Sequence, residues 1–221
     1  MIEQTFFYWV ILNNLTLHSA SETRDLGVIL DSALSYKSHI YSTIQKSMKM
    51  LGFIKRTTRD FTNISAIKSL YFSLVRSHFD YCSTIWSPYY FTHKLKIEAV
   101  QHNFLRYTAS KLHVYYDYSV LERILNLPPL EVRRKQRDLI ILFKIINGLC
   151  NCPELLSKIS LFVPSRSTRQ VQTFYVSFHR FNYSYNTFIP RTLRLANSLN
   201  NLEIFNISVS RFKNLISSLT F

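Results

Sequence analysis

The feature that most constrains this fold is a stretch of apolar residues at helical spacing, from residue 64 to residue 87. Apolar side chains recur there at three- and four-residue steps, which places them on one face of a helix of roughly 20 residues. Pro88 lacks the N–H that would continue a helix and disfavours helical geometry at Ser87, so we expect the helix to end there. The expected apolar face consists of Ile64, Ile67, Leu70, Tyr71, Leu74, Val75, Phe79, Cys82 and Trp86.

The same spacing predicts helices on both sides of this stretch. Asn63 precedes the central helix and Thr92 precedes the helix after it, and both are expected N-caps, because their side-chain oxygens can accept the free amide protons of a first turn. Pro128 and Pro129 separate two later helices, and Gly148 is an expected C-terminal stop. The seam of the first helix, which begins near residue 38, is Ile40, Ile44, Met48, Leu51 and Phe53. The seam expected at 92–112 is Leu95, Ala99, Val100, Phe104 and Thr108, and further helices are expected near 119–126, 130–147 and 208–219.

Strand signals are confined to the two ends of the chain. Near the N-terminus, Phe6–Leu12 and Leu26–Leu30 are predicted to form a strand pair, with the polar stretch His18–Thr23 between them. Near the C-terminus, residues 162–192 are rich in Tyr, Phe, Ser and Asn, a composition that favours β structure. We therefore expect a mainly α fold with a short N-terminal strand pair and a small β-leaning C-terminal segment. The expected divisions are 1–35, 36–160 and 161–221, with a boundary near 160.

The chain has a strong excess of positive charge. It carries 27 Lys plus Arg against 13 Asp plus Glu, a formal net charge of +14 at pH 7. Such an excess attracts polyanions, and nucleic acid is the commonest partner of a basic, non-repetitive domain. Some soluble proteins are simply basic, so charge alone does not decide between the two interpretations.

Two basic clusters and one aromatic segment are the candidates for contacts with nucleic acid. Residues of the first cluster are Lys46, Lys49, Lys55, Arg56 and Arg59, and those of the second are Arg133, Arg134 and Arg137. With Lys135, the second cluster crowds the first turns of the 130–147 helix, where the helix dipole is already positive. Either cluster can instead be a solvated face. Aromatic residues between Arg169, Arg180 and Arg191 could stack on unpaired bases or pack as a hairpin on the helices.

Several classes of protein do not fit the sequence. Three cysteines without a C-x-x-C spacing argue against a disulfide framework and a structural zinc site. His93, His102 and His113 are not spaced as ligands on one helical face. The apolar run at 6–12 is too short to cross a bilayer and follows no basic region. We therefore expect a chain inside the cell, nuclear or cytoplasmic and not secreted, with no membrane association and no small-molecule substrate.

The sequence offers no paired carboxylates for a two-metal catalytic site. Two-metal sites hold their Mg²⁺ ions with carboxylates that lie close together, since the metals stabilise both the attacking and the leaving oxygen of a phosphoryl transfer. No two acidic residues are adjacent in this sequence. The nearest candidates, Asp25, Asp31 and Asp80, are interpreted as cap or surface carboxylates. We predict no catalytic residue, no metal ligand and no cofactor.

The amino-acid sequences of six segments carry further information. These are RDLGVILDSALSYKSHI at 24–40, LGFIKR at 51–56, SLVRSHFDYCSTIWSP at 73–88, IEAVQHNFLRY at 97–107, LNLPPLEVRRKQRDL at 125–139 and NCPELL at 151–156. In this order they resemble the region downstream of the catalytic palm in reverse transcriptases of non-LTR retrotransposons, in particular the jockey-like elements of animals. Six collinear segments make the resemblance specific.

The resemblance implies a thumb and a C-terminal extension, helical elements that grip a template–primer duplex beside a polymerase palm. It implies RNA or an RNA–DNA duplex as the partner, and Mg²⁺ only for a palm that this sequence lacks. Residues 1–35 would end the palm, 36–160 would form the thumb-like bundle and its extension, and 161–221 an aromatic-rich segment with a final helix. The implied protein is a fragment of an RNA-directed DNA polymerase, not an enzyme on its own. Two alternatives stay open: a host protein–protein interaction module, and an inert relic with exposed apolar surface.

Overall fold

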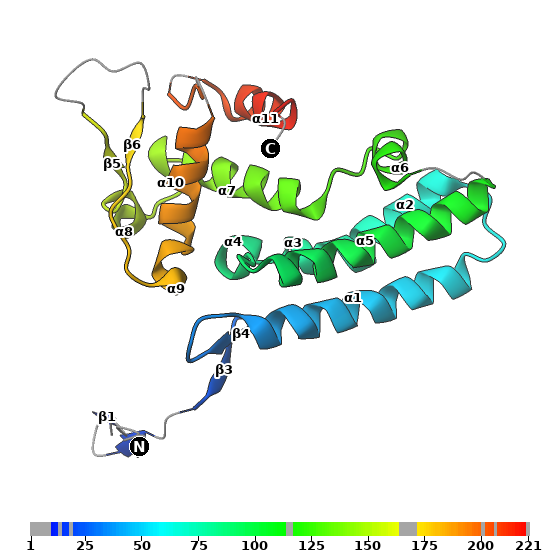
Figure 1. Cartoon of the computed structure of the whole chain (residues 1–221), viewed down its shortest axis with the longest axis horizontal. Coiled ribbons are helices and arrows are strands. Elements are labelled where there is room, and N and C mark those ends of the chain that lie inside the picture. Colours follow the sequence, from blue (N-terminus) through cyan, green and yellow to red (C-terminus); the bar gives the residue numbers. More distant parts are fainter. Residues whose placement is uncertain are drawn as a thin grey trace.

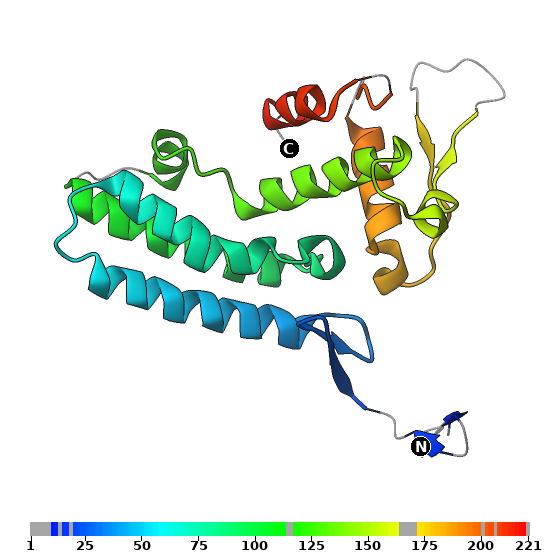
Figure 2. The same cartoon turned by 180° about the vertical axis from the view of Figure 1, so that it is seen from behind.

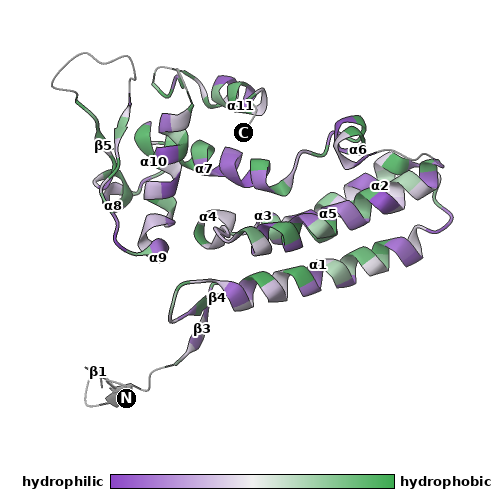
Figure 3. Ribbon diagram, in the orientation of Figure 1, coloured by the Kyte–Doolittle hydropathy of each residue, from purple (hydrophilic) through white to green (hydrophobic). Residues whose placement is uncertain are grey.

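The structure is a computed structural model that describes residues 10–12, 15–17, 20–113, 117–163, 172–199, 202–205 and 207–219. Within these residues the protein is mainly helical, which confirms the expected fold class. Figures 1 and 2 show the long helices α1 and α5 side by side with nearly aligned axes, and α7 leading from them towards the C-terminal elements. Figure 3 shows apolar and polar residues alternating along each long helix, as expected of amphipathic helices.

Two short antiparallel hairpins open the described chain. Their strands are β1 (Val10–Leu12) with β2 (Leu15–Leu17), and β3 (Glu22–Asp25) with β4 (Val28–Asp31). The predicted pairing of Phe6–Leu12 with Leu26–Leu30 is therefore wrong, although residues 6–9 lie outside the described residues. The predicted polar connection His18–Thr23 is also wrong in part, because Glu22 and Thr23 belong to β3.

The pairing is local because a tight turn folds β4 back onto β3. Leu26 and Gly27, at the turn, both have positive φ, 43° and 85°. Positive φ at both central residues matches the twist of a two-residue hairpin, and glycine adopts it at low cost. The Tyr81 hydroxyl donates a hydrogen bond to the Leu26 carbonyl at 2.6 Å, so the turn is held against the helical part.

Helix α1 (Lys37–Thr57) begins close to the predicted position, but its buried face differs from the predicted seam. Met48 and Phe53 of that seam are 42% and 46% exposed. The buried face follows three- and four-residue steps that start at His39 and Ile40. The predicted seam shares Ile40 and Leu51 with this face, but its other steps lead to the exposed Met48 and Phe53. The buried residues are His39, Ile40, Thr43, Ser47, Leu51 and Ile54.

The expected single helix over 64–87 is divided into four pieces. They are α2 (Ile64–Tyr71), the π-helical η1 (Phe72–Arg76), α3 (Ser77–Asp80) and α4 (Ser83–Trp86). The N-cap prediction is confirmed, since the Asn63 side chain accepts the N–H groups of Ser65 and Ala66 at 2.9 and 3.3 Å. The predicted end before Pro88 is confirmed as well. Between α3 and α4 the chain turns at Cys82, whose φ is 48°.

The π-helical turn keeps one apolar row facing the core. Ile67, Tyr71, Val75 and Phe79 follow each other at steps of four, and all are at most 2% exposed. On a regular α-helix each such step drifts by about 40°, because four residues exceed one turn of 3.6. A wider π turn offsets part of that drift, and such turns are frequent at functional sites.

Helix α5 (Phe91–Leu112) packs against α1. Its N-cap residue is Tyr90, so the predicted cap at Thr92 is wrong. Leu95 of the predicted seam is 52% exposed and Ala99 is exposed too. The face that packs on the core is set by the side chains that meet α1 and α2. It consists of His93, Ile97, Val100, Gln101, Phe104, Leu105, Thr108 and Ala109.

Helices α6 (Tyr118–Ile124) and α7 (Leu130–Ile146) follow as predicted. Pro129, the residue before α7, has no side-chain group that could cap the helix. Instead the Glu98 carboxylate of α5 accepts the N–H groups of Leu130 and Glu131 at 3.1 and 2.7 Å. A carboxylate at a helix N-terminus is favoured by the helix dipole. This contact ties α7 to α5.

The C-terminal part is more helical than its composition predicts. Its elements are α8 (Pro153–Leu156), β5 (Ser160–Leu161) paired with β6 (Phe174–Tyr175), α9 (Asn182–Tyr185), α10 (Phe188–Ser198) and α11 (Val209–Ser217). The β prediction for 162–192 is therefore wrong from Asn182 onward. Pro190 lies in the first turn of α10, where its missing N–H costs nothing. Phe178, within the segment predicted to favour β structure, is 91% exposed and lies in no strand.

Two hydrophobic cores meet along α7. The first core runs from Val28 to Leu130 and includes the fully buried Trp86 and Phe104. The second contains Leu139, Leu142 and Phe143 of α7 with residues of β6, α10 and α11. The second core thus begins before the expected boundary at 160. Helix α7 belongs to both, its first residue to one core and its second half to the other.

Candidate nucleic-acid interface

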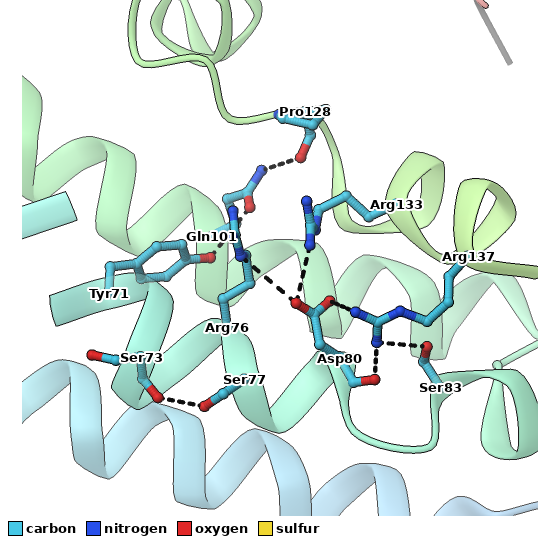
Figure 4. A network of polar contacts seen from close by, with 10 residues as sticks. All are labelled: Tyr71, Ser73, Arg76, Ser77, Asp80, Ser83, Gln101, Pro128, Arg133 and Arg137. Atoms are coloured by element: carbon cyan, nitrogen blue, oxygen red, sulfur yellow. Dashed lines mark hydrogen bonds and ion pairs between the residues drawn. The ribbon is translucent and has the colours of Figure 1, made fainter. Parts of the chain in front are cut away.

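Two of the predicted contact arginines, Arg133 and Arg137 of α7, bind one carboxylate instead of facing solvent. Arg133 Nη2 lies 3.0 Å from Asp80 Oδ2, and Arg137 Nη2 lies 3.3 Å from Asp80 Oδ1. Arg137 also donates to the Asp80 carbonyl and, at 3.4 Å, to the Ser83 hydroxyl. Figure 4 shows these side chains converging on Asp80 from α7. Arg133 and Arg137 therefore join α7 to α3 and α4.

A third arginine completes this network. Arg76 Nε lies 3.8 Å from Asp80 Oδ2, and its guanidinium stacks over the Phe72 ring at 3.4 Å from the centroid. Both Phe72 and Arg76 belong to the π-helical segment η1. Burial lowers the pKa of Arg76, and the charge of Arg133 adds to the effect. Arg76 and Asp80 are four residues apart, so the helix places both side chains on one face within reach of each other.

The third predicted arginine of α7, Arg134, is turned into the protein. It is only 5% exposed, so the expectation of a solvated or phosphate-binding side chain is wrong for it. Its position follows from the helix, because Arg134 and the buried Asp138 lie four residues apart on one face. Asp138 Oδ2 in turn accepts Arg191 Nε of α10 at 3.0 Å. Burial raises the pKa of Asp138, which Arg191 opposes.

A buried polar group fixes the chain between α6 and α7. Gln101 of α5 is fully buried and accepts a hydrogen bond from the Tyr71 hydroxyl at 3.2 Å. Its amide donates to the carbonyls of Leu127 and Pro128 at 3.4 and 3.1 Å. Figure 4 shows this connection beside the Asp80 network. Burial raises the pKa of Tyr71 far above its usual value, so its hydroxyl stays protonated and donating.

The first predicted cluster does not form a single surface. Successive residues of an α-helix are rotated by about 100°, so Lys46 and Lys55, nine positions apart, project on opposite flanks of α1. Burial and then the charge of Lys46 lower the pKa of His78, which places Lys46 on the flank towards α3. Lys49 and Arg56 are exposed and project outward between the flanks. Lys55 lies on the flank towards α5.

Lys55 and the backbone of Arg59 instead meet two cations of α5, Arg106 and Lys111, that the sequence interpretation missed. Lys55 Nζ and Lys111 Nζ lie 5.9 and 5.8 Å from the centroid of the Tyr107 ring. Lys111 Nζ donates to the carbonyl of Arg59 and, at 3.1 Å, to that of Phe61. Burial and then the charge of Arg106 lower the pKa of Lys55. We call Lys55, Arg59, Arg106 and Lys111, with Tyr107 between them, the Tyr107 cluster.

The Tyr107 cluster stands at the C-terminal ends of two helices that run in the same direction. The Tyr107 hydroxyl donates to the Thr58 carbonyl at 3.1 Å and lies 2.8 Å from the Thr58 hydroxyl. This contact joins the last turn of α5 to the end of α1. In the described part of the chain, none of the ion pairs involves a cation of this cluster. Arg59 and Arg106 are exposed, and Lys55 and Lys111 are half-buried.

The only sequence signal for Arg106 is its place in the segment IEAVQHNFLRY. No spacing rule relates Arg106 or Lys111 to Lys55, because the direction of α5 relative to α1 is a tertiary property. The aromatic candidates also separate. Arg169 lies outside the described residues, Arg180 lies 5.7 Å from the Phe181 ring centroid, and Arg191 is bound by Asp138.

The acidic candidates are occupied by structural contacts. Asp31 Oδ1 accepts the N–H groups of Ala33 and Ser35 at 3.1 and 2.9 Å. Burial tends to raise the pKa of Asp31, but these hydrogen bonds outweigh it and lower the pKa. Asp25 pairs with Val28 in the β3–β4 hairpin, and Asp80 is the centre of the arginine network. Among the described residues, no group of three or more His, Cys, Asp and Glu side chains is placed to hold a metal ion.

The chain matches no protein-family model, no curated protein and no solved structure. The resemblance to reverse transcriptases thus rests on the six segments alone, and the function that it implies is a proposal. In the described part of the chain, no helix combines the length and the apolar character needed to cross a membrane.

Proposed function

We propose that this protein binds RNA or RNA–DNA duplex through phosphate contacts, as a thumb-like part derived from a retrotransposon-encoded reverse transcriptase. It does so without polymerase activity of its own and without a cofactor. The Tyr107 cluster is the primary contact. The outward residues Lys49 and Arg56 extend it along α1.

One observation carries the proposal: two groups of basic residues in the helical part differ in how their charge is compensated. Arg76, Arg133 and Arg137 share Asp80, and their charge is compensated inside the protein. Lys55, Arg106 and Lys111 lie close together, the backbone of Arg59 joins them, and none of the four residues has an ion pair to any described carboxylate. Like charges that lie close together repel each other in the free protein, and a bound polyanion relieves this repulsion. When the cations of the protein neutralise phosphates, counterions of the nucleic acid are also released, which favours binding.

The chemistry of the cluster favours backbone contacts over base readout. Lysine ammonium groups are flexible point charges that suit phosphate oxygens, and arginine binds phosphate in a bidentate manner. Such contacts position a protein on a duplex but carry no sequence information. Tyr107 is half-buried, with its hydroxyl bound to Thr58, so it supports the cations instead of stacking on bases. Binding is therefore sequence-tolerant.

The test is a filter-binding titration of an RNA–DNA hybrid with the purified chain at several salt concentrations. For each phosphate neutralised, the log–log slope is expected near −0.9 on a B-form duplex and about −0.7 on single strands, with a hybrid in that range. Two hybrids of unrelated sequence should bind alike. No measurable binding at low salt, or binding that salt does not weaken, would overturn the proposal and favour a protein–protein interaction module.

A further inference from the structure

A small cavity lies where α7 and α10 meet the loop before α5. Its volume is about 250 Å³, and Ser87, Pro88 and Tyr89 form one wall. This is several times the roughly 30 Å³ that one water occupies in the liquid. It is below the ~300–1,000 Å³ of sites for drug-sized ligands. The size suits a small ion.

The lining of this cavity is rich in positive charge. Lys94 of α5, Arg134 and Lys135 of α7, and Arg191 and Arg194 of α10 all line it. Only two carboxylates, Glu131 and Asp138, belong to the same lining. Glu131 is bound by Lys94 at 2.8 Å and by Lys135 at 3.6 Å, and Asp138 is bound by Arg191 at 3.0 Å. The lining keeps an excess of positive charge, so it attracts an anion.

Two guanidinium groups of the lining carry buried nitrogen atoms without hydrogen-bond partners. Neither Arg134 Nη1 nor Arg134 Nη2 has a partner among the described residues, and both atoms are buried. Arg194 Nη1 is in the same state, although Arg194 Nη2 donates to the Tyr185 carbonyl at 2.8 Å. A buried charged donor without an acceptor is unfavourable, and such groups in folded proteins call for a specific reason. A bound oxyanion supplies the missing acceptors.

One acceptor of the lining is also unsatisfied. Asp138 Oδ2 receives Arg191 Nε, but Asp138 Oδ1 is buried without a partner. An anion without hydrogen, such as sulfate or chloride, would leave Asp138 Oδ1 unpaired and repel it. Inorganic phosphate near pH 7 carries both acceptor oxygens and at least one O–H. It is therefore able to satisfy the arginines and the aspartate together.

We propose that this cavity is a site for hydrogen phosphate, in which Arg134 and Arg194 donate to the phosphate oxygens and Asp138 Oδ1 accepts the phosphate O–H. The site is separate from the proposed nucleic-acid interface. Phosphodiesters of RNA and DNA have no ionisable O–H at neutral pH and do not fit it. The same group can come as free phosphate or as a phosphate monoester. Monoesters lose their last proton with a pKa of about 6, so at pH 7 free phosphate is the better ligand.

The experiment is thermal unfolding of the whole chain at pH 7.0, with sodium phosphate, sodium sulfate or glycerol phosphate added at an ionic strength kept constant with sodium chloride. We expect phosphate to raise the unfolding temperature with a saturating concentration dependence, because ligand bound only to the folded state stabilises it. Sulfate should bind about tenfold more weakly or worse, since it leaves Asp138 Oδ1 unpaired. Tighter binding of glycerol phosphate than of free phosphate would identify a monoester as the ligand of the same site.

Three variants make the test specific. Arg134→Met should abolish the phosphate response, and Arg194→Gln should weaken phosphate binding about tenfold. Lys213→Gln, which removes one exposed charge of α11 outside the lining of the cavity, should keep the full response. If Arg134→Met does not fold, the phosphate response of Arg194→Gln tests the site alone. A response to phosphate no larger than that to chloride or sulfate, or one that Arg134→Met or Arg194→Gln retains in full, would overturn the site.

Discussion

The Asp80 carboxylate forms ion pairs with three guanidinium groups, more than any other carboxylate described above. The side chains of Arg76, Arg133 and Arg137 are between 17% and 33% exposed, so solvent screens them only in part. Removing the carboxylate charge leaves three neighbouring cations that repel one another. The network therefore depends on one residue, and its loss should loosen the junction between α7 and α3.

We predict that Asp80→Asn lowers the free energy of unfolding by about 1–3 kcal/mol, less than for a fully buried ion pair because the groups are partly solvated. Urea denaturation followed by circular dichroism measures it. The matched control is Glu203→Gln, whose partner Arg211 lies 4.0 Å away with both side chains well exposed. That change should stay within about 0.5 kcal/mol. Equal effects of the two substitutions would show that the Asp80 network contributes nothing to stability.

Three histidines that are buried or half-buried, His39, His78 and His93, are expected to make the stability of the fold depend on pH. Burial, and then the charges of Lys46 and Arg24, lower the pKa of His39, and His39 Nδ1 accepts the Ile29 N–H at 3.4 Å. Burial likewise lowers the pKa of His78 and His93. In the unfolded chain these histidines protonate near their ordinary pKa of about 6.5, while the folded chain resists protonation. The unfolded state thus binds more protons in the window just below that value.

We therefore predict that stability is complete above pH 7 and falls as the pH drops from 7 towards 5, because protonation favours the unfolded chain. Urea midpoints at pH 7.5, 6.5 and 5.5 measure the slope. His39→Asn should reduce the slope, since one of the groups that take up protons on unfolding is gone. His113→Asn, an exposed residue at the end of α5, is the control and should leave it unchanged. A midpoint that does not move between pH 7.5 and 5.5 would contradict this assignment.

At the scale of elements, helical spacing predicted where most helices lie but not which face is buried. Leu95 fits an apolar period in α5, yet it is 52% exposed because the core side is set by packing against α1 and α2. The interruption of the 64–87 helix could not be read from periodicity either. Cys82 adopts a positive φ and the π turn begins at Phe72, and neither residue type signals such geometry. Pro88 and Asn63 act through local chemistry, and both were predicted correctly.

The register of the divided helix leads to a prediction at its centre. The π turn places Val75 in the core at 0% exposure, while Leu74 is only half-buried and Ser73 is exposed. Val75→Asp should lower the free energy of unfolding by about 4 kcal/mol or more, since it buries an unpaired charge. Leu74→Asp should cost less, and Ser73→Asp is the control with little effect. Thermal unfolding by circular dichroism gives the order. A larger loss for Leu74→Asp than for Val75→Asp would show that the helix is regular through this segment.

At the scale of the whole molecule, the sequence predicted an excess of cations but not their distribution. Arg133, Arg134 and Arg137 form a conspicuous run, but Asp80 compensates the charge of Arg133 and Arg137, and Arg134 is buried. Arg106 and Lys111 are inconspicuous in the sequence. They become candidates only because α5 ends beside α1. Tertiary pairing therefore separates structural arginines from cations that remain for a partner.

The central claim is that phosphate contacts are concentrated at the Tyr107 cluster. Two variants with equal loss of charge test it most directly: Lys55→Gln/Arg59→Gln/Arg106→Gln in the cluster, and Lys46→Gln/Lys49→Gln/Arg56→Gln on the rest of α1. In filter binding to an RNA–DNA hybrid at several salt concentrations, the cluster variant should flatten the log–log slope by roughly two to three units. It should also weaken binding to all sequences alike, and the matched α1 variant should flatten the slope by less. Equal slopes for the two variants, or a cluster variant with the slope of the unmodified chain, would contradict the claim.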